Sequence, residues 1–313
     1  MSTQTLSDIL EKQLSVDTPD ALATLTEALR NKHGSSLQAI LFYGSCLRSG
    51  DAFDGLVDLY LIVDSYRAFY ARQGRALANW LLPPNVFYLE TALGDRTIRA
   101  KYAVLSEQDF LRGTSQRWFH SYIWGRFTQP VAQIYRRDKQ AGDTVITGLS
   151  QAICTFLNRV IPRLPASGSI RDLWVQGLQL SYQAELRTES GQRTVMLVGQ
   201  EPDYYSAITR ATAEKLRYPL QTGEDNRYHS SVPAVTRALS RISWPLRQWQ
   251  GKLLSVLRLL KALFTFEGGL DYIAWKLERH SGQSVDIPDR VRRYPLVFIW
   301  GLFWRLYRRG IFR

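Results

Sequence analysis

Residues 41–64, LFYGSCLRSGDAFDGLVDLYLIVD, contain two apolar runs with a small-residue turn after the first and an acid near the start of the second. Gly44 and Ser45 would let backbone N–H groups approach phosphate oxygens without interference from side chains. Asp58 supplies a carboxylate, which is a preferred ligand of Mg²⁺. Phosphoryl transfer from a nucleoside triphosphate needs both features at close quarters. The structural alternative is a tight turn after a strand, with a surface acid nearby.

A single carboxylate is an incomplete magnesium site. Asp58 has no second acid two residues away, because Leu56 and Tyr60 occupy those positions. Another acid must therefore complete the site, and the sequence offers four: Asp51, Asp54, Glu90 and Glu185.

The elements that must position these residues form a mixed unit over residues 1–106. Helical spacing over residues 8–32 and 65–82 alternates with two buried strands, LQAILFYG and GLVDLYLIV. The segments NVFYLETAL and TIRAKYAVLS predict a β-hairpin around Gly94-Asp95. We expect this unit to be a small mixed α/β domain that carries the triphosphate site.

The rest of the chain reads as mainly helical. Residues 107–235 predict a helical domain that completes the cleft, with its least regular part between 190 and 233. Residues 236–313 predict a basic amphipathic region. The expected fold class is therefore α+β, with a mixed sheet followed by helices.

Composition narrows the class of protein. The 313 residues are 45% hydrophobic and contain two cysteines, which excludes a disulfide scaffold and favours a reducing compartment. The polar N-terminus lacks the profile of a signal peptide. The four histidines have no metal-ligand spacing.

Positive charge is concentrated at the C-terminus. Residues 240–313 hold 14 Lys and Arg against 5 Asp and Glu, within a net charge of +12. Apolar residues at helical spacing lie among these charges: Trp244, Leu246, Trp249, Leu253, Leu254, Leu257, Leu260 and Leu263. The apolar run near the end, with Trp300, Trp304 and Tyr307, is too short to cross a bilayer, which needs ~20 residues.

These residue types favour an anionic membrane surface. We expect a peripheral protein on the cytoplasmic side of a membrane, the inner membrane in a bacterium. The alternative is an ordinary helical core with a solvated basic face.

Several stretches follow one another in a recognisable order: Tyr43-Gly44-Ser45, then KYAV from Lys101, WGRFTQPV from Trp124 and LSYQAELR from Leu180. With Asp58, this series resembles the mitochondrial translocator-assembly-and-maintenance family of phosphatidate cytidylyltransferases, within the DNA polymerase beta-like nucleotidyltransferases. That family also lacks one acid of the paired signature. The resemblance covers roughly residues 41–187, and it implies that residues 1–106 form a nucleotidyltransferase domain. Departures include Cys46 in place of a glycine and Gln129 in place of a basic residue, and the last 75 residues have no match.

The resemblance implies a Mg²⁺-dependent transfer of CMP from CTP to phosphatidic acid or a similar anionic lipid, giving CDP-diacylglycerol for phospholipid synthesis. It implies catalytic roles for Asp58, Lys101 and Glu185. Substrate binding would fall to Tyr43, Gly44, Ser45, Arg126, Tyr182 and Arg187. The expected metal ligands are Asp58 and Glu185, with Glu90 as a further candidate.

Each of these residues also has a structural alternative. Lys101 could form a buried salt bridge, Glu185 a surface ion pair with Arg187, and Arg126 a helix cap. Glu90 could be a solvated strand residue, and Tyr182 a core residue instead of a stacking surface for cytosine.

Two other functions stay open at this point. One is nucleotidyl transfer to another acceptor, such as RNA, a protein or a sugar phosphate, although no nucleic-acid partner is expected. The other is a non-catalytic, membrane-bound module with a nucleotidyltransferase fold. The sequence sets neither the base preference nor the oligomeric state.

Overall fold

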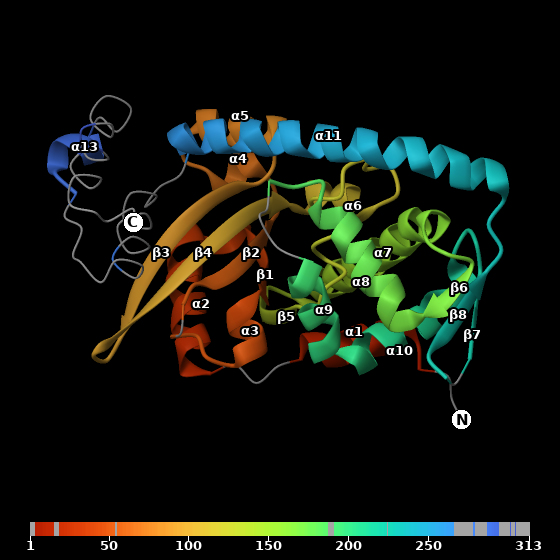
Figure 1. The fold of residues 1–313 in the computed structure, drawn as a ribbon. Helices are drawn as coiled ribbons and strands as arrows, with labels where there is room; N and C mark the ends of the chain where they lie inside the picture. The colour runs from red at the N-terminus through yellow and green to blue at the C-terminus, as the bar shows by residue number, and fades with distance from the viewer. Residues whose placement is uncertain are drawn as a thin grey trace.

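The computed structural model describes residues 4–15, 19–53, 55–186, 191–223, 225–265 and 287–293, together with Glu278, Gly301 and Trp304. Its main sheet has five strands in the order β3-β4-β2-β1-β5 (Figure 1). The β2–β4 pair is parallel and the other pairs are antiparallel, so the sheet is mixed. The strands are β1 (Leu37–Tyr43), β2 (Val57–Val63), β3 (Asn85–Leu93), β4 (Arg96–Ser106) and β5 (Ala132–Arg136).

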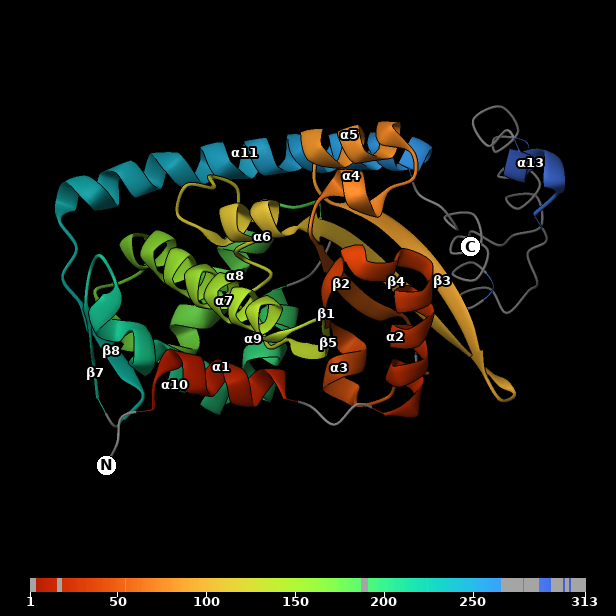
Figure 2. The same ribbon diagram turned by 180° about the vertical axis from the view of Figure 1, so that it is seen from behind.

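Strands β1 and β2 at the centre are mostly apolar and buried, which is typical of a sheet that is covered on both faces. One face packs against α2 (Asp20–His33), which lies in front of the strands in Figure 2 together with α3 (Ser45–Ser49). The opposite face packs against a layer of helices. That layer draws on α1 (Leu6–Leu14), α6 (Glu107–Thr114), α7 (Lys139–Val160), α8 (Ile170–Tyr182), α9 (Gly191–Gln200) and α10 (Pro202–Thr212).

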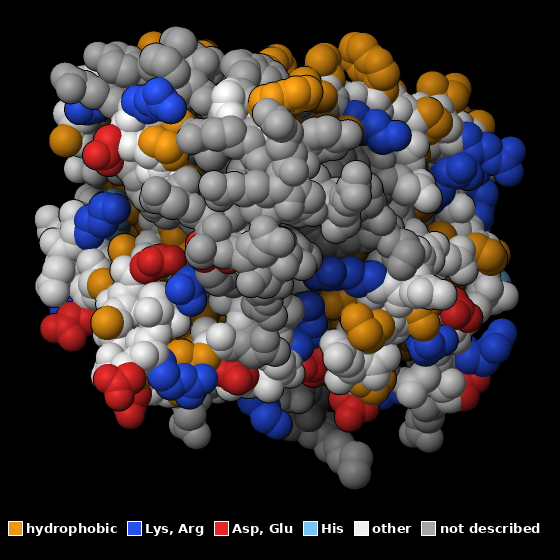
Figure 3. All heavy atoms as spheres, turned by 60° about the vertical axis from the view of Figure 1, so that its left-hand side comes forward, with side chains coloured by type: hydrophobic (Ala, Val, Ile, Leu, Met, Phe, Trp, Pro, Cys, Tyr) orange, Lys and Arg blue, Asp and Glu red, His pale blue; other side chains and the backbone are white. Residues whose placement is uncertain are grey.

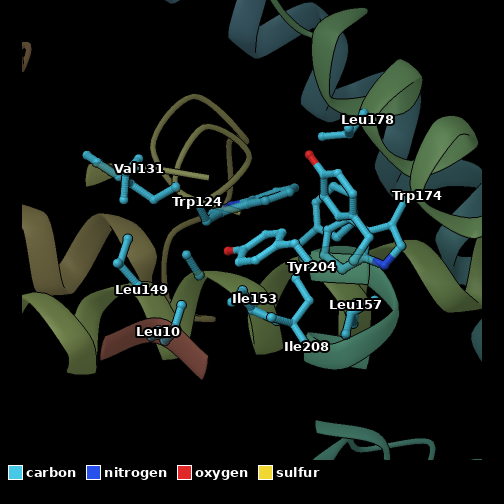
Figure 4. Packing of buried hydrophobic residues seen from close by; sticks show 14 of the residues in the cluster. Leu10, Trp124, Val131, Leu149, Ile153, Leu157, Trp174, Leu178, Tyr204 and Ile208 are labelled. Atoms are coloured by element: carbon cyan, nitrogen blue, oxygen red, sulfur yellow. The ribbon is translucent and has the colours of Figure 1, made fainter. Parts of the chain in front are cut away.

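The core of the helical layer is built from aromatic rings. Trp174 stacks on Phe156 with ring centroids 4.7 Å apart, and Trp124 lies edge-on to Phe156. Figure 4 shows Trp124 and Trp174 among the aliphatic side chains of this core. Within the described part of the chain, one helical stretch, Lys139–Arg163, is long and apolar enough to cross a membrane. Its most apolar window is 56% buried inside the protein, as in the central helix of a packed core.

Helix α11 (Ala234–Thr265) runs along the top of Figure 1 and joins the two parts of the molecule. Its 32 residues span about 48 Å at 1.5 Å per residue. It contacts the short helix η2 (Ile161–Arg163) near one end, and β3 and α5 (Gln73–Leu81) near the other. Trp244 and Arg247 on its inner face are completely or almost completely buried.

The mixed α+β class and the hairpin around Gly94 are confirmed, but several element boundaries differ from the prediction. Residues 8–32 contain two helices, because Pro19 precedes α2 as its N-cap residue. Residues 65–82 divide into α4 (Tyr66–Phe69) and α5. Strand β5 and the turns between α6 and β5 lie where the sequence pattern predicts helix.

The segment predicted to be irregular contains α9, α10 and part of a small sheet. That sheet is ordered β6-β8-β7 and comprises β6 (Ser167–Ser169), β7 (Leu220–Thr222) and β8 (Arg227–Ser230). The division into residues 1–106, 107–235 and 236–313 stays a prediction. Near the C-terminus the structure describes α13 (Asp289–Arg293) and the exposed Trp304, while Trp300 and Tyr307 lie outside the described residues.

Candidate functional site

Four side chains form a row across the sheet where β1 ends and β2 begins. Tyr43 pairs with Asp58, Asp58 with Lys101, and Lys101 with Tyr88 in the strand register. Because directly paired residues project from the same face of a sheet, the row lies on one side. Tyr43 and Tyr60 of that side pack against the helical layer. The row therefore faces the junction between the sheet and the helices.

The corner at Gly44 has the geometry that the sequence predicts. Gly44 has φ +94° and ψ −158°, a region of backbone conformation populated almost only by glycine. A Cβ atom added there would lie 2.8 Å from Asp58 Oδ2, so the Asp58 carboxylate lies against the glycine backbone. Ser45 follows as the exposed first residue of α3. The small-residue turn and the acid are thus brought together.

Lys101 and Asp58 form a salt bridge, with 2.8 Å between Lys101 Nζ and Asp58 Oδ1. Their side chains are 33% and 21% exposed, so the pair is partly open to solvent. The salt-bridge alternative for Lys101 is therefore present in this structure. Burial, and then the negative charge of Asp58, raise the pKa of Tyr43 to about 12, so that its hydroxyl stays protonated at neutral pH.

A second ion pair joins the turn after α6 to the end of α8. Arg126 Nη2 lies 3.1 Å from Glu185 Oε2, and both side chains are nearly buried. Burial lowers the pKa of Arg126, but nearby Tyr60 and Glu185 outweigh it and raise that pKa well above its ordinary value. Arg126 therefore stays cationic. Glu185 therefore pairs with Arg126, and Arg187, its partner in the structural alternative, lies outside the described residues.

The Arg126 guanidinium also lies over two aromatic rings, 5.6 Å from the Tyr43 centroid and 5.1 Å from that of Tyr122. Its Nε has no hydrogen-bond partner among the described residues. This contact links Arg126 to the row on the sheet through Tyr43. A buried N–H without a partner is costly, so the site has donor capacity that an anionic ligand would satisfy.

Tyr182 and Arg48 complete the surroundings of this site. Tyr182 is buried and donates a hydrogen bond from its hydroxyl to Gln129 Oε1 at 3.0 Å, as its core-packing alternative predicts. Arg48 on α3 is half-buried, and burial together with nearby Arg193 lowers its pKa. Tyr182 and Asp58 act on the pKa of Arg48 in the opposite direction, so Arg48 lies within electrostatic range of both. The sequence analysis missed Arg48, although it lies only three residues after Ser45.

Glu90 lies apart from the acids at the junction. It accepts hydrogen bonds from Tyr88 at 2.6 Å and from Arg99 at 3.0 Å, and its side chain is 42% exposed. It is two residues from Tyr88 on the same face of β3, about 7 Å further along the strand. These contacts match its alternative as a solvated strand residue.

The expected magnesium site can be compared with these donors. Among the described residues, no group of three or more acids, histidines or cysteines is arranged to hold a metal. Asp58 and Glu185 are each paired with a cation. Mg²⁺ nevertheless needs only one or two protein carboxylates when substrate phosphates supply further ligands. Asp58, beside the open glycine corner, fits a magnesium ion carried in by a triphosphate.

A cavity of about 320 Å³ opens beside this site, below α11. Lys101 and Glu185 line it together with Arg258 and Lys261 of α11, and Pro84, Val86, Leu186 and Leu259 form apolar walls. Arg258 donates to the Pro83 carbonyl at 2.9 Å, but its Nη1 has no hydrogen-bond partner among the described residues. We call this space the acceptor cavity. It combines positive charge with apolar surface, which suits an amphiphilic anion.

Lys261 contributes to the charge of this cavity. Its Nζ donates to the carbonyls of Leu82 at 2.5 Å and Pro84 at 2.8 Å. Burial, followed by the nearby charge of Arg258, lowers the pKa of Lys261 to about 7. An anion bound in the cavity would favour its protonated form.

No family model matches this sequence, and no curated protein matches it. Among solved structures, the chain is similar to a nucleotidyltransferase-like protein from Exiguobacterium sibiricum 255-15, with 12% identity and a TM-score of 0.27. The match covers 93% of this chain and 92% of that protein. A likeness with so low a TM-score and identity carries no argument about the fold or the activity of this chain. Function is therefore inferred from the geometry of Gly44, Asp58 and Lys101.

Proposed function

We propose that this protein is a phosphatidate cytidylyltransferase, which transfers CMP from CTP to the phosphate of phosphatidic acid and releases pyrophosphate. One observation carries the proposal. Lys101 belongs both to the row beside the Gly44 corner and to the wall of the acceptor cavity. A nucleotide at the corner and an acceptor in the cavity would thus meet at the same ammonium group. The choice of CTP and phosphatidic acid comes from the motif series between residues 43 and 187.

In this proposal the triphosphate lies against the backbone of Gly44 and Ser45, where no side chain blocks its approach. Asp58 would hold Mg²⁺ together with phosphate oxygens, and the metal would neutralise charge on the departing pyrophosphate. The Asp58 carboxylate would then exchange its pairing with Lys101 for the metal. Lys101 would become available to a phosphate oxygen of either substrate.

The reaction forms a bond between an oxygen of the acceptor phosphate and the α-phosphorus of CTP, while the bond from that phosphorus to pyrophosphate breaks. A phosphate oxygen is already ionised near neutral pH, so no strong general base is required. Positioning and charge stabilisation supply most of the catalysis in such a step. Lys101 and Arg126 are the cations placed to provide it, and Arg258 would hold the acceptor.

The outer face of α11 supports a lipid acceptor. It exposes apolar side chains along its whole length, all but one adjacent pair at intervals of three or four residues: Val235, Leu239, Ile242, Leu246, Trp249, Leu253, Val256, Leu257, Leu260 and Phe264. We call this set the apolar stripe. Leu77, Trp80 and Leu81 of α5 are also exposed beside the last part of α11. Figure 3 shows hydrophobic side chains gathered along the upper edge of the molecule, where Figure 1 places α11.

Charge on α11 points to an anionic surface. The helix contains six Lys and Arg and no Asp or Glu. Arg241 and Lys252 are exposed beside the apolar stripe. Each basic residue near an anionic membrane contributes about 1 kcal/mol to binding. Of the two Trp in the expected stripe, Trp249 lies on this exposed face, whereas Trp244 faces the core.

The test is turnover of labelled CTP with Mg²⁺ and vesicles that contain phosphatidic acid. We expect Asp58→Asn to abolish formation of the lipid product. Asp51→Asn is the matched control, because Asp51 is exposed and its Oδ1 only accepts a hydrogen bond from the Phe53 backbone at 2.8 Å. Absence of turnover with each of the four nucleoside triphosphates would leave a non-catalytic module. Turnover with a soluble acceptor alone would favour a different nucleotidyltransferase.

A further inference from the structure

A second basic cavity lies under the first half of α11, away from the candidate active site. Its volume is about 320 Å³, and it shares no lining residue with the acceptor cavity. Three arginines line it: Arg159 at the end of α7, Arg217 before β7, and Arg247 of α11. None of the described residues that line it is acidic. We call it the arginine cavity.

Arg247 is the most deeply placed of the three. Its side chain has no solvent-exposed surface, and its Nε donates to the Phe119 carbonyl at 2.7 Å. The guanidinium lies 4.6 Å from the ring centroid of Phe119 and 4.5 Å from that of Trp244. Both terminal nitrogens, Nη1 and Nη2, have no hydrogen-bond partner among the described residues. A buried cation with two unused donor groups therefore lies next to this cavity.

The aromatic contacts offset part of the cost of burying this charge. The aromatic rings do not replace the missing hydrogen bonds. A buried guanidinium whose N–H groups have no acceptors is strongly disfavoured. Burial, and then the charge of Arg159, lower the pKa of Arg247 to about 10. Arg159 donates one bond, to the Gln116 carbonyl at 2.7 Å, and lies close enough to Arg217 to be affected by its charge. An oxyanion would relieve both the missing bonds and the repulsion.

We propose that the arginine cavity binds a phosphate group. Guanidinium groups match the oxygens of a phosphate with paired hydrogen bonds, and the polar side chains Ser240 and Ser243 also line the wall. The phosphate has two sources with the same chemistry, a free phosphate or diphosphate and the headgroup of a lipid. Leu239 belongs to both the cavity wall and the apolar stripe, which places the cavity next to any bound membrane.

The first experiment measures thermal unfolding of the full-length protein in inorganic phosphate and in pyrophosphate, against chloride at equal ionic strength. Binding to the folded state raises the melting temperature in a saturable way. We expect Arg217→Gln to weaken this binding about tenfold, as for loss of one charged hydrogen bond. Arg217 is exposed, so the variant should fold. Arg171→Gln, an exposed arginine on α8 outside the cavity, is the matched control and should bind as the unaltered protein does.

The second arm compares flotation with vesicles that carry phosphatidate, which exposes a phosphomonoester, and phosphatidylglycerol, which does not. A preference for phosphatidate that Arg217→Gln removes and Arg171→Gln retains would assign the cavity to a lipid headgroup. Saturable stabilisation by the free anions with the same dependence on Arg217 would assign it to a soluble phosphate. Stabilisation whose dependence on anion concentration is the same in Arg217→Gln as in the unaltered protein belongs to another site, such as the candidate active site. The proposal is overturned if neither the thermal stabilisation nor the flotation depends on Arg217. Arg247→Gln, if it folds, should weaken the same binding as Arg217→Gln does.

Discussion

Gly44→Ala is the substitution that most directly tests the candidate active site. The added Cβ would lie 2.8 Å from Asp58 Oδ2 and 3.2 Å from Asp58 Cβ. To reach the ordinary contact distance of 3.4 Å, the carboxylate oxygen must move away by at least 0.6 Å. A rotation of the carboxylate alone cannot relieve the contact with Cβ, so β1 and β2 must also separate slightly. The substitution therefore displaces the acid without removing it.

Two costs follow from this geometry. The backbone of Gly44, at φ +94° and ψ −158°, is strained for alanine by about 1–3 kcal/mol, which lowers the free energy of unfolding. The displaced carboxylate affects catalysis separately, because an error of about 1 Å in a positioned group can cost about 100-fold in rate. For the smaller shift here we expect kcat/KM to fall about 10- to 100-fold, which corresponds to about 1.4–2.7 kcal/mol.

Gly50→Ala is the matched control. Gly50 ends α3 with φ +71°, so alanine is strained there too, but a Cβ at that position meets no atom within 4 Å. Both variants are assayed for transfer from CTP to phosphatidate at a temperature where each is folded, and their unfolding is followed by urea titration. Binding of Mg-CTP by calorimetry gives a second measurement that does not depend on turnover. The reasoning is refuted if Gly44→Ala and Gly50→Ala retain the same kcat/KM and the same affinity for Mg-CTP.

Three further predictions concern the ion pair, the response to pH and the membrane surface. Glu185→Ala leaves Arg126 buried without its partner and should lower the free energy of unfolding, measured by urea titration, by about 3 kcal/mol. The double variant Glu185→Ala with Arg126→Leu should recover part of this loss. Losses that simply add in the double variant would contradict the pairing. His33 stacks on Phe69, and burial, followed by the charge of Lys32, lowers its pKa to about 4, so the unfolded chain binds more protons than the folded one between about pH 6.5 and 4. The free energy of unfolding should therefore fall as the pH is lowered across that window, by up to about 3 kcal/mol from this residue. His33→Gln should make this fall less steep. An unchanged slope would exclude His33 as its source. Trp249→Glu should reduce flotation with anionic vesicles, whereas Glu278→Gln, outside the stripe, should not, and equal flotation of both would argue against the stripe as the contact surface.

Local patterns predicted the sheet well. The apolar runs around Leu41 and Leu59 are buried on both faces, and the hairpin follows from Gly94 between alternating segments. The pattern failed where packing outweighs local preference. Residues 132–136 form β5 because the free edge of β1 needs a partner for its backbone groups, and nothing in their short sequence signals that demand.

The sequence predicted the approach of Asp58 to the Gly44 turn in the candidate site, but it did not predict the ion pairs there. Gly44 and Asp58 come together as expected because β1 and β2 are neighbours in sequence and in the sheet. The Arg126–Glu185 pair joins segments 59 residues apart, and only the packing of the helical layer brings them together. Arg48 was not predicted, because a basic residue in a polar segment has no sequence pattern that marks it as part of a site. The arginine cavity could not be found from sequence at all, since its three arginines come from separate elements.

Helix α11 has a geometric consequence for how a lipid would reach the acceptor cavity. Its outer face carries the apolar stripe, and its other face supplies Arg258 and Lys261 to the cavity wall. A helix with its side chains is about 10 Å across, so the cavity lies roughly one helix thickness from the surface that would rest on acyl chains. The polar layer of a leaflet is itself about 5–8 Å deep. The thickness of the helix would thus hold the catalytic cations at about the level of the lipid phosphates. A phosphatidate molecule could then react while its acyl chains stay in the bilayer.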